Sequence, residues 1–189
     1  MKFSIVTPTL QRESLIRCCQ SVDQQTYADW EHLVQVDSSE FNMEIIEQVE
    51  GPQRFIAHDR SHHGHYGNHA RALACDAAAG DYFVWLDDDN YMADPVALQR
   101  IERYLESAHF PDWALFPIHR HGSVFLLQPP GMCMTDSANM VVKREIGRWP
   151  DIEAREADGV LAERLKAYPY VAFPQCAPII VMEKSSNGI

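Results

Sequence analysis

Tyr82-Phe83-Val84-Trp85-Leu86-Asp87-Asp88-Asp89-Asn90 joins a short apolar run to three consecutive aspartates. The apolar run predicts a buried β-strand, because such runs bounded by polar residues are typical of a sheet interior. Three adjacent carboxylates at a strand end are costly, since like charges repel and burial penalises each of them. A divalent cation would remove this cost, whereas a simple polar turn would explain the triplet without a ligand. The rest of the chain has to separate these two readings.

Strand-like and helix-like segments alternate on the N-terminal side of this stretch. Strands are expected over residues 3–7, 32–36, 54–57 and 82–86, with Pro8 ending the first, and helices near residues 14–22, 45–49, 68–79 and 94–107, with Gly80 capping the third. This alternation predicts an α/β fold with a mainly parallel sheet flanked by helices. Ligands bind beyond the carboxyl ends of such strands, where Thr7, Asp37 and Asp87 are expected to converge.

The pattern is less regular beyond residue 110. Strands are expected over residues 113–118, 124–127, 170–173 and 179–182, a short apolar segment over residues 140–142, and a helix over residues 159–166. The length of 189 residues suits one domain, and residues 183–189 are expected to form a frayed tail.

Composition excludes several classes of protein. With 46% hydrophobic and 23% charged residues the chain has the make-up of a globular protein. The net charge of -11 argues against a nucleic-acid partner held by bulk electrostatics. A phosphate ligand in so acidic a chain would need local arginines, a metal ion or both.

Cysteine usage and hydropathy bear on the compartment. The five cysteines are an odd number without Cys-x-x-Cys spacing, which argues against a disulfide framework or a structural zinc site. No signal peptide opens the chain, and no apolar stretch is long enough to span a bilayer. We therefore expect reduced thiols in a cytoplasmic protein without a transmembrane segment.

Four segments, taken in order, resemble the family-2 inverting glycosyltransferases, which have the GT-A fold. They are Ser4-Ile5-Val6-Thr7-Pro8-Thr9 with Ser21-Val22-x-x-Gln25-x-Tyr27, then Val34-Gln35-Val36-Asp37-Ser38-Ser39, then Ala70-Arg71 through Asp87-Asp88-Asp89-Asn90, and finally Asp158-x-x-Leu161-x-x-Arg164-Leu165. Each motif is weak alone, but their order and spacing together are specific. The resemblance covers about residues 3 to 166.

This resemblance implies a nucleotide-sugar donor, with a UDP-sugar as the family-level expectation, and a saccharide or other hydroxyl acceptor. It also implies a divalent cation, Mn²⁺ or Mg²⁺, and inversion at the anomeric carbon. About residues 1–110 would bind the donor and about residues 111–182 would lie on the acceptor side. The acceptor half is short, so a homodimer could complete the cleft.

The aspartate triplet would serve as the D-x-D motif of the family. By this resemblance Asp89 ligates the metal, while Asp87 contacts the donor ribose or a metal-bound water. Asp88 would help to position the sugar, although turn chemistry explains Asp88 and Asn90 equally well.

The same resemblance assigns the remaining donor contacts. Asp37 would accept a hydrogen bond from the uracil imide, and Thr7, Pro8 and Thr9 would line that pocket, unless they simply end the strand. Two cations are candidates for the donor diphosphate or for bracing the carboxylates, namely Arg12 and Arg71.

Asp158 is the expected general base, which takes the proton from the acceptor hydroxyl as its oxygen attacks the sugar carbon. An aspartate before Gly159 could equally cap the helix that follows. Many family members have an acidic pair here, whereas this chain has Ala157 before Asp158. Glu156 and Glu153 therefore remain alternative bases.

Histidines and tryptophans complete the candidates. His58, His62, His63, His65 and His69 cluster in one loop, but no acidic or cysteine partner lies at standard metal spacing. His119 and His121 could line the acceptor side. Trp85 is expected in the core, and packing is favoured over sugar stacking for Trp149.

Three other functions compete with sugar transfer. A sugar-nucleotide-binding protein without turnover would explain the missing acidic neighbour of Asp158. A metal-dependent phosphohydrolase would use the aspartate triplet but leaves Asp37 and Asp158 unexplained. A nucleotidyltransferase is disfavoured because no glycine-rich phosphate loop follows the first strand.

Overall fold

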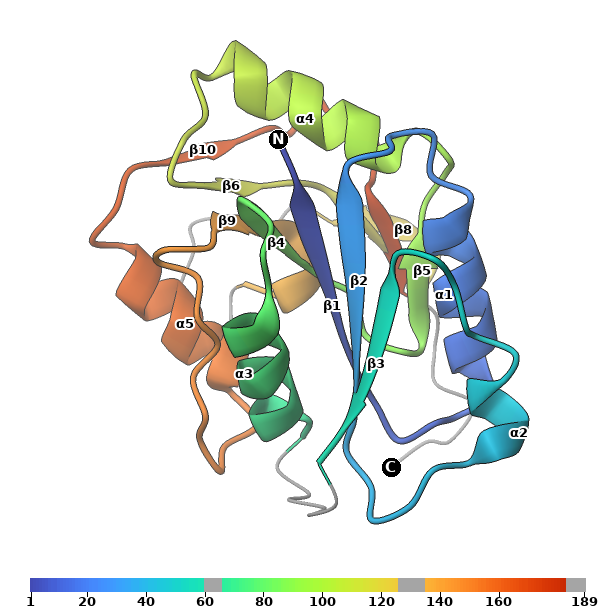
Figure 1. The fold of residues 1–189 in the computed structure, drawn as a ribbon. Helices are drawn as coiled ribbons and strands as arrows, with labels where there is room; N and C mark the ends of the chain where they lie inside the picture. The colour runs from blue at the N-terminus through green and yellow to red at the C-terminus, as the bar shows by residue number, and fades with distance from the viewer. Residues whose placement is uncertain (60–65, 126–134, 183–189) are drawn as a thin grey trace.

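The fold is built on a seven-stranded sheet (Figure 1). It is described from a computed structural model over residues 1–59, 66–125 and 135–182. The strands of this sheet lie in the order β10 (Tyr170–Ala172), β6 (Trp113–Leu115), β9 (Met140–Lys143), β4 (Tyr82–Trp85), β1 (Phe3–Thr9), β2 (Trp30–Val36) and β3 (Arg54–His58). All neighbours pair in parallel except β9, which runs antiparallel to β4 and β6. The predicted α/β fold with a mainly parallel sheet is therefore confirmed.

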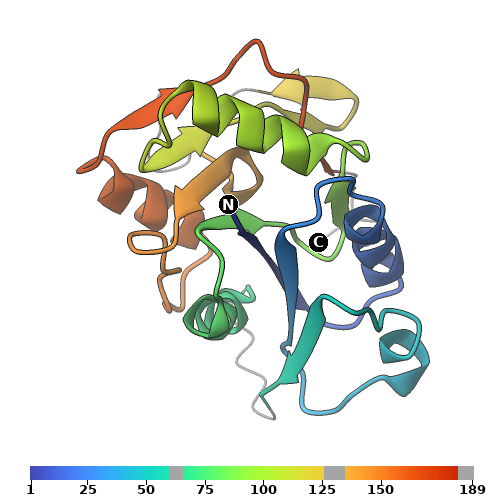
Figure 2. The same cartoon turned by 45° about the horizontal axis from the view of Figure 1, so that its top comes forward.

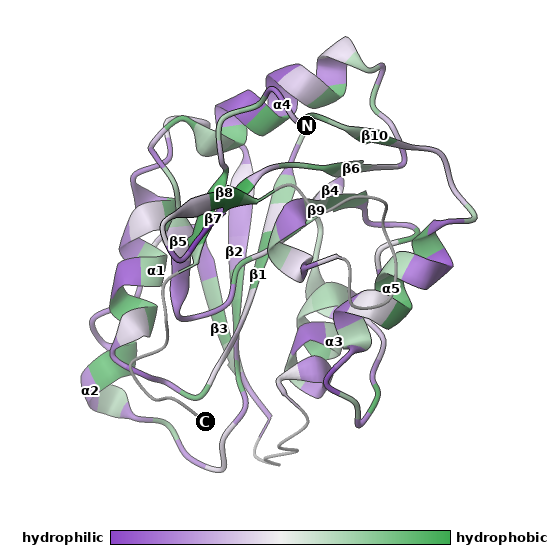
Figure 3. Cartoon of the chain, turned by 180° about the vertical axis from the view of Figure 1, so that it is seen from behind, coloured by the Kyte–Doolittle hydropathy of each residue, from purple (hydrophilic) through white to green (hydrophobic). Residues whose placement is uncertain are grey.

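Five helices cover the two faces of the sheet (Figure 2). Buried residues of α1 (Ser14–Asp23), α2 (Met43–Ile46) and α4 (Ala97–Ser107) pack on one face. Those of α3 (Asn68–Ala77) and α5 (Ala157–Leu165) pack on the other face. Along α4, hydrophobic and hydrophilic residues alternate, as in a helix with one buried side (Figure 3).

A second, smaller sheet contains strands in the order β5 (Asn90–Met92), β11 (Ile180–Met182), β7 (Ile118–Arg120) and β8 (Ser123–Phe125). The prediction of one strand over residues 113–118 is wrong. Pro117 separates β6 from β7, and the two strands belong to different sheets. Asn90 is the first residue of β5, so it has a second role beyond closing the turn after β4.

Gly80 does not cap α3 as predicted. The helix ends at Ala77, and the following Ala78 is already extended. Gly80 instead allows a close approach of two backbones, because a Cβ atom there would lie 2.7 Å from the Ser4 nitrogen and 2.9 Å from the Lys2 oxygen. Its N–H donates to the Ser4 hydroxyl at 2.9 Å.

Pro8 does not end the first strand either. β1 continues through Pro8 to Thr9, and its seven residues are all buried between β2 and β4. Proline is tolerated here at the cost of one ladder hydrogen bond, because it has no N–H.

The described cysteines are free and buried, namely Cys18, Cys19, Cys75 and Cys176. Within the described ranges, every helix is too short or too polar to cross a bilayer.

Candidate donor and catalytic site

A pocket of about 470 Å³ opens where the carboxyl ends of β1, β2 and β4 meet the start of α3. Because the three strands are parallel, the residues that follow them lie at one edge of the sheet. The lining consists of Pro8, Thr9, Leu10, Arg12, Asp37, Tyr66, Gly67, Arg71, Asp87, Asp88 and Asp89. It contains all the predicted site residues except Thr7 and Asp158.

Asp88 is the most buried of the three aspartates, with 1% of its side chain exposed. Its carboxylate accepts a hydrogen bond of 2.6 Å from the Thr9 hydroxyl and forms an ion pair with the Arg12 guanidinium. These contacts connect the end of β4 to the segment after β1. Asp88 therefore stabilises the pocket through these contacts, and little of its side chain is available to a ligand.

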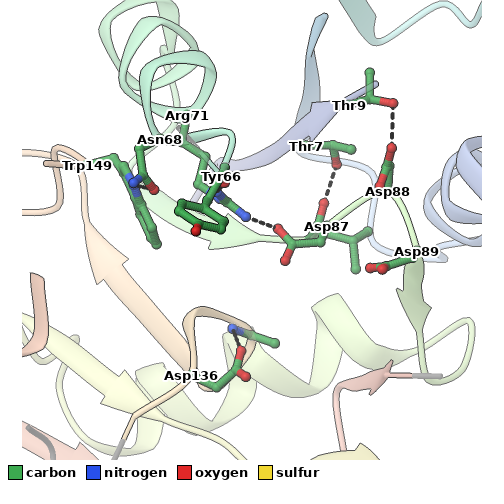
Figure 4. A network of polar contacts seen from close by, with 12 residues as sticks. Thr7, Thr9, Tyr66, Asn68, Arg71, Asp87, Asp88, Asp89, Asp136 and Trp149 are labelled. Atoms are coloured by element: carbon green, nitrogen blue, oxygen red, sulfur yellow. Dashed lines mark hydrogen bonds and ion pairs between the residues drawn. The ribbon is translucent and has the colours of Figure 1, made fainter. Parts of the chain in front are cut away.

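Arg71 approaches the triplet from α3 and pairs with Asp87 (Figure 4). Its Nη1 donates to the Tyr66 carbonyl at 2.8 Å, and its guanidinium carbon lies 4.9 Å from the centre of the Trp149 ring. The Nε atom is buried and has no hydrogen-bond partner among the described residues. Gly67, at φ 72°, leaves room for Arg71, because a Cβ atom there would lie 3.3 Å from Arg71 Nη1 and 3.0 Å from the Pro8 Cβ.

Asp89 lies at the open side of the pocket. Its carboxylate is 3.6 Å from Arg12 Nη1, a weaker approach than the pair that Arg12 forms with Asp88. Burial raises the pKa of the Asp89 carboxyl above its ordinary value, and the neighbouring Asp87 carboxylate raises it further. Crowded carboxylates of this kind are stabilised by a positive charge.

Thr7, which was predicted to line the pocket unless it simply ends the strand, is not among the lining residues. It is fully buried, and its hydroxyl donates to the Leu86 carbonyl at 2.6 Å and lies 2.9 Å from His32 Nε2. Every second side chain of a strand points to the same face, so Thr7 and Thr9 share one face of β1, and of the two only Thr9 lines the pocket.

Asp158 lies beside the pocket, in the first turn of α5. The helix begins at Ala157 and not at Gly159, so Asp158 is inside the helix and is not its capping residue. One carboxylate oxygen accepts a 2.7 Å hydrogen bond from the Gly159 N–H. Burial raises the pKa of Asp158 and the Asp87 carboxylate adds to this, although the Gly159 N–H and Arg71 act in the opposite direction.

Asp136 is a half-buried acidic residue that the sequence reading missed. It precedes the short 3-10 helix Ser137–Asn139, lies 3.8 Å from Arg120 and accepts a 3.0 Å hydrogen bond from the Ala138 N–H. In Figure 4 it lies opposite the Asp87 side chain. Burial raises the pKa of Asp136, and Asp87 and Asp158 raise it further, so the three carboxylates share one electrostatic environment.

Only some of the clustered histidines lie within the described residues. His62, His63 and His65 lie outside the described residues. His58 bonds the Ser38 carbonyl at 2.6 Å, and His69 bridges Asp59 and Asp151 at 3.2 and 3.0 Å. Within the described ranges, no group of three or more acidic, histidine or cysteine side chains could hold a metal ion.

Both tryptophan predictions agree with the structure. Trp85 is buried in the core. Trp149 is 2% exposed, its Nε1 donates to the Asn68 side chain at 3.0 Å, and its ring contacts Trp85, which leaves little surface for a sugar.

The residues missing from the predicted pocket are Leu10, Tyr66 and Gly67. Tyr66 is 64% exposed and has a positive φ, which a tyrosine rarely adopts. The Tyr-Gly pair directly before the arginine helix was the available signal, because glycine there suggests a close backbone approach.

The chain is similar to known proteins in its sequence family and in its fold. The family model described as Glycosyl transferase family 2 matches residues 4–148. No curated protein sequence matches significantly.

Solved structures share the fold over nearly the whole chain. S. aureus TarS residues 1-349 in complex with UDP-GlcNAc matches with a TM-score of 0.78 and 16% identity, covering 100% of this chain and 60% of that one. The mannosyltransferase PcManGT from Pyrobaculum calidifontis, in complex with GDP-Man and Mn2+, matches with a TM-score of 0.70 and 14% identity, covering 97% and 58%. The crystal structure of S. aureus TarS matches with a TM-score of 0.76 and 15% identity, and the match covers 98% of this chain and 37% of that one.

Proposed function

The chain belongs to glycosyl transferase family 2, and we propose that it transfers a sugar from a nucleotide-diphosphate donor to an acceptor hydroxyl. The observation that carries this proposal is the pocket, where aspartates after β4 lie beside two arginines at the carboxyl edge of a parallel sheet. A UDP-sugar is the favoured donor, because Asp37 lines the pocket from the end of β2, where an acceptor for the uracil imide is needed. The likeness to the UDP-GlcNAc complex of TarS supports the same choice.

A divalent cation, Mn²⁺ or Mg²⁺, fits the residues present. Asp87 and Asp89 are partly exposed in the pocket, and burial together with the nearby Asp87 carboxylate raises the pKa of Asp89. Two carboxylates, completed by donor phosphates and water, are a usual protein share of a magnesium or manganese site. When bound, the ion would supply Lewis-acid stabilisation of the departing diphosphate.

The two arginines have different tasks in this proposal. Arg71 is nearly buried and anchored to Tyr66 and Trp149, so it holds Asp87 in one orientation. Arg12 has 43% of its side chain exposed, and it reaches both Asp88 and Asp89. Arg12 is therefore the cation better able to turn toward a donor diphosphate.

We assign the general base to Asp158. In a single displacement the acceptor oxygen bonds to the anomeric carbon, the bond from that carbon to the diphosphate breaks, and the hydroxyl proton passes to a carboxylate. The raised pKa of Asp158 brings this group nearer to the pH at which a base works best. Asp136 is the second candidate, because it shares the same electrostatic environment, whereas Glu153 and Glu156 are exposed.

The test measures UDP release from UDP-GlcNAc and other UDP-sugars with Mn²⁺, with and without saccharide acceptors. Asp158→Asn should lower kcat by about 10²- to 10⁴-fold while leaving UDP affinity within a few-fold, because the amide cannot accept the proton. Glu156→Gln is the matched control at the start of the same helix and should leave kcat unchanged.

Three outcomes would contradict parts of this assignment. Turnover that survives in Asp158→Asn but is lost in Asp136→Asn would move the base to Asp136. Tight Mn²⁺-dependent UDP binding without turnover under any condition would indicate a sugar-nucleotide-binding protein. Phosphate release from simple esters would indicate a phosphohydrolase.

A further inference from the structure

The hydrogen-bond ladder between β1 and β4 has a gap directly before the aspartate triplet. Val6 pairs with Trp85, and the Leu86 N–H donates to the Val6 carbonyl at 3.0 Å. In a parallel ladder the next bond would run from residue 8 to the Leu86 carbonyl. Residue 8 is a proline, which has no N–H, so the backbone leaves this carbonyl without its donor.

The Thr7 side chain fills the gap. Its hydroxyl donates to the Leu86 carbonyl at 2.6 Å, and the residue is fully buried (Figure 4). A hydroxyl has one proton, which this bond uses, so Thr7 can only accept from its other polar neighbours. These are His32 Nε2, at 2.9 Å, and the Cys18 thiol, at 3.9 Å.

The proton count then fixes the state of His32. Arg54 Nε, which can only donate, lies 3.0 Å from His32 Nδ1, so Nδ1 has no proton. His32 is therefore neutral, with its proton on Nε2, as the bond to Thr7 requires. Burial and the Arg54 charge both lower the pKa of His32 well below its ordinary value, in agreement with this state.

Arg54 is held in turn by residues of α1. Its side chain is fully buried, and it donates to the Cys19 carbonyl at 3.0 Å and to Asp23 at 2.6 Å, both of which belong to α1. We call the chain of Asp23, Arg54, His32, Thr7 and the Leu86 carbonyl the cross-sheet relay. It passes through β3, β2 and β1 to the end of β4, and each bond in it has a single possible direction.

We infer that the cross-sheet relay positions the D-x-D segment, and that Thr7 and His32 are positioning residues for the metal-diphosphate site. The Leu86 carbonyl belongs to the peptide that leads into Asp87, so holding this carbonyl sets the direction in which the chain enters the aspartate triplet. Pro8 makes the relay necessary, because the backbone cannot hold the carbonyl itself. This inference rests on the proposed function, since it assigns the relay a task in donor binding.

The experiment compares Thr7→Val with Thr7→Ser in the full chain. Valine fills the volume of threonine but removes the hydroxyl, whereas serine keeps it. The readout is Mn²⁺-dependent UDP binding by calorimetry, together with urea unfolding. Thr7→Val should weaken UDP binding by about tenfold or more, and Thr7→Ser should stay within about threefold of the wild type.

Ser4→Ala is the matched control, because it removes another buried hydroxyl from β1. The Ser4 hydroxyl donates to Glu31 at 2.6 Å, at the end of the strand away from the pocket. This variant should lose stability but retain the UDP affinity of the wild type. A purely structural role of Thr7 would make Thr7→Val behave in the same way and would overturn the inference.

His32→Phe gives a second measurement, and it serves alone should Thr7→Val not fold. It keeps a ring in the core but removes the donor to Thr7, so Mn²⁺-dependent UDP binding should again weaken. Unchanged binding in this variant would overturn the role of His32. Absence of Mn²⁺-dependent UDP binding in the wild type would contradict the proposed function itself, which is a different result from either of these.

Discussion

Asp89 is the side chain whose removal should most weaken metal-dependent UDP binding. It lies in the pocket with Arg12 Nη1 at 3.6 Å, and its raised pKa reflects burial and the nearby Asp87 carboxylate. Asp89→Ala should weaken Mn²⁺-dependent UDP binding by about 100-fold or more, because one of only two protein carboxylates for the ion is lost. Calorimetric titration of UDP with Mn²⁺, and again with a chelator, measures this effect.

The matched control for Asp89 is Asp76→Ala. Asp76 is an exposed carboxylate near the end of α3 that pairs with Arg148, so its removal changes the net charge equally. UDP affinity should not change in this variant. Normal metal-dependent binding by Asp89→Ala would show that the ion lies elsewhere.

Single residues were predictable where their chemistry is concentrated in a short motif. The aspartate triplet, Asp37 and Arg71 were predicted to lie at one site, and they line one pocket, because charged residues at neighbouring strand and helix ends meet at one edge of the sheet. Thr7 was misplaced because its partner, the Leu86 carbonyl, is 79 positions away in the sequence. Asp136 was missed for the same reason, since only the folded chain brings it near Asp87 and Asp158.

The junction between α3 and β4 depends on Gly80. A Cβ atom there would lie 2.5 Å from the Ser4 hydroxyl oxygen and 2.7 Å from the Ser4 nitrogen, which is closer than packed atoms approach. Gly80→Ala should therefore lower the free energy of unfolding by about 1–3 kcal/mol, the usual cost of overpacking. Urea unfolding measures this, with Ala79→Ser, at the exposed neighbouring position, as a control that should change stability little. Equal stability of Gly80→Ala would mean that the two backbones can separate at no cost.

The elements themselves were largely predictable, because hydrophobic periodicity is a local property of the sequence. The alternation of strands and helices up to α4 was found with small shifts in their ends, but β5 was missed. The segment after residue 110 was harder, since residues 113–118, from β6 to the first residue of β7, form one continuous apolar run. Their separation into two sheets depends on Pro117 and on partners from β9 and β11.

At the scale of the whole molecule, the net charge of -11 did not prevent a site suited to an anion. The pocket places Arg12 and Arg71 directly against the aspartates, so two positive groups lie among four carboxylates. Composition could exclude a partner held by bulk charge, but it could not reveal this pairing. The strand order, with β1 between β2 and β4, is what brings the three carboxyl ends together.

The cross-sheet relay should also make the stability of the whole fold depend on pH. His32 is buried and neutral in the folded chain, and its pKa there lies well below the ordinary 6.5 that it regains on unfolding. Below about pH 6.5 the unfolded chain therefore binds a proton that the folded chain does not, so this part of the stability is present above that pH and is lost as the pH falls.

His32→Gln offers one donor and one acceptor but cannot take up a proton. Between about pH 7.5 and 5.5, urea unfolding of the wild type should lose stability more steeply than the variant, by up to about 1.4 kcal/mol per pH unit. Other titrating groups affect both proteins equally, so parallel curves would show that His32 is protonated in the folded chain and that the direction assigned to the relay is wrong.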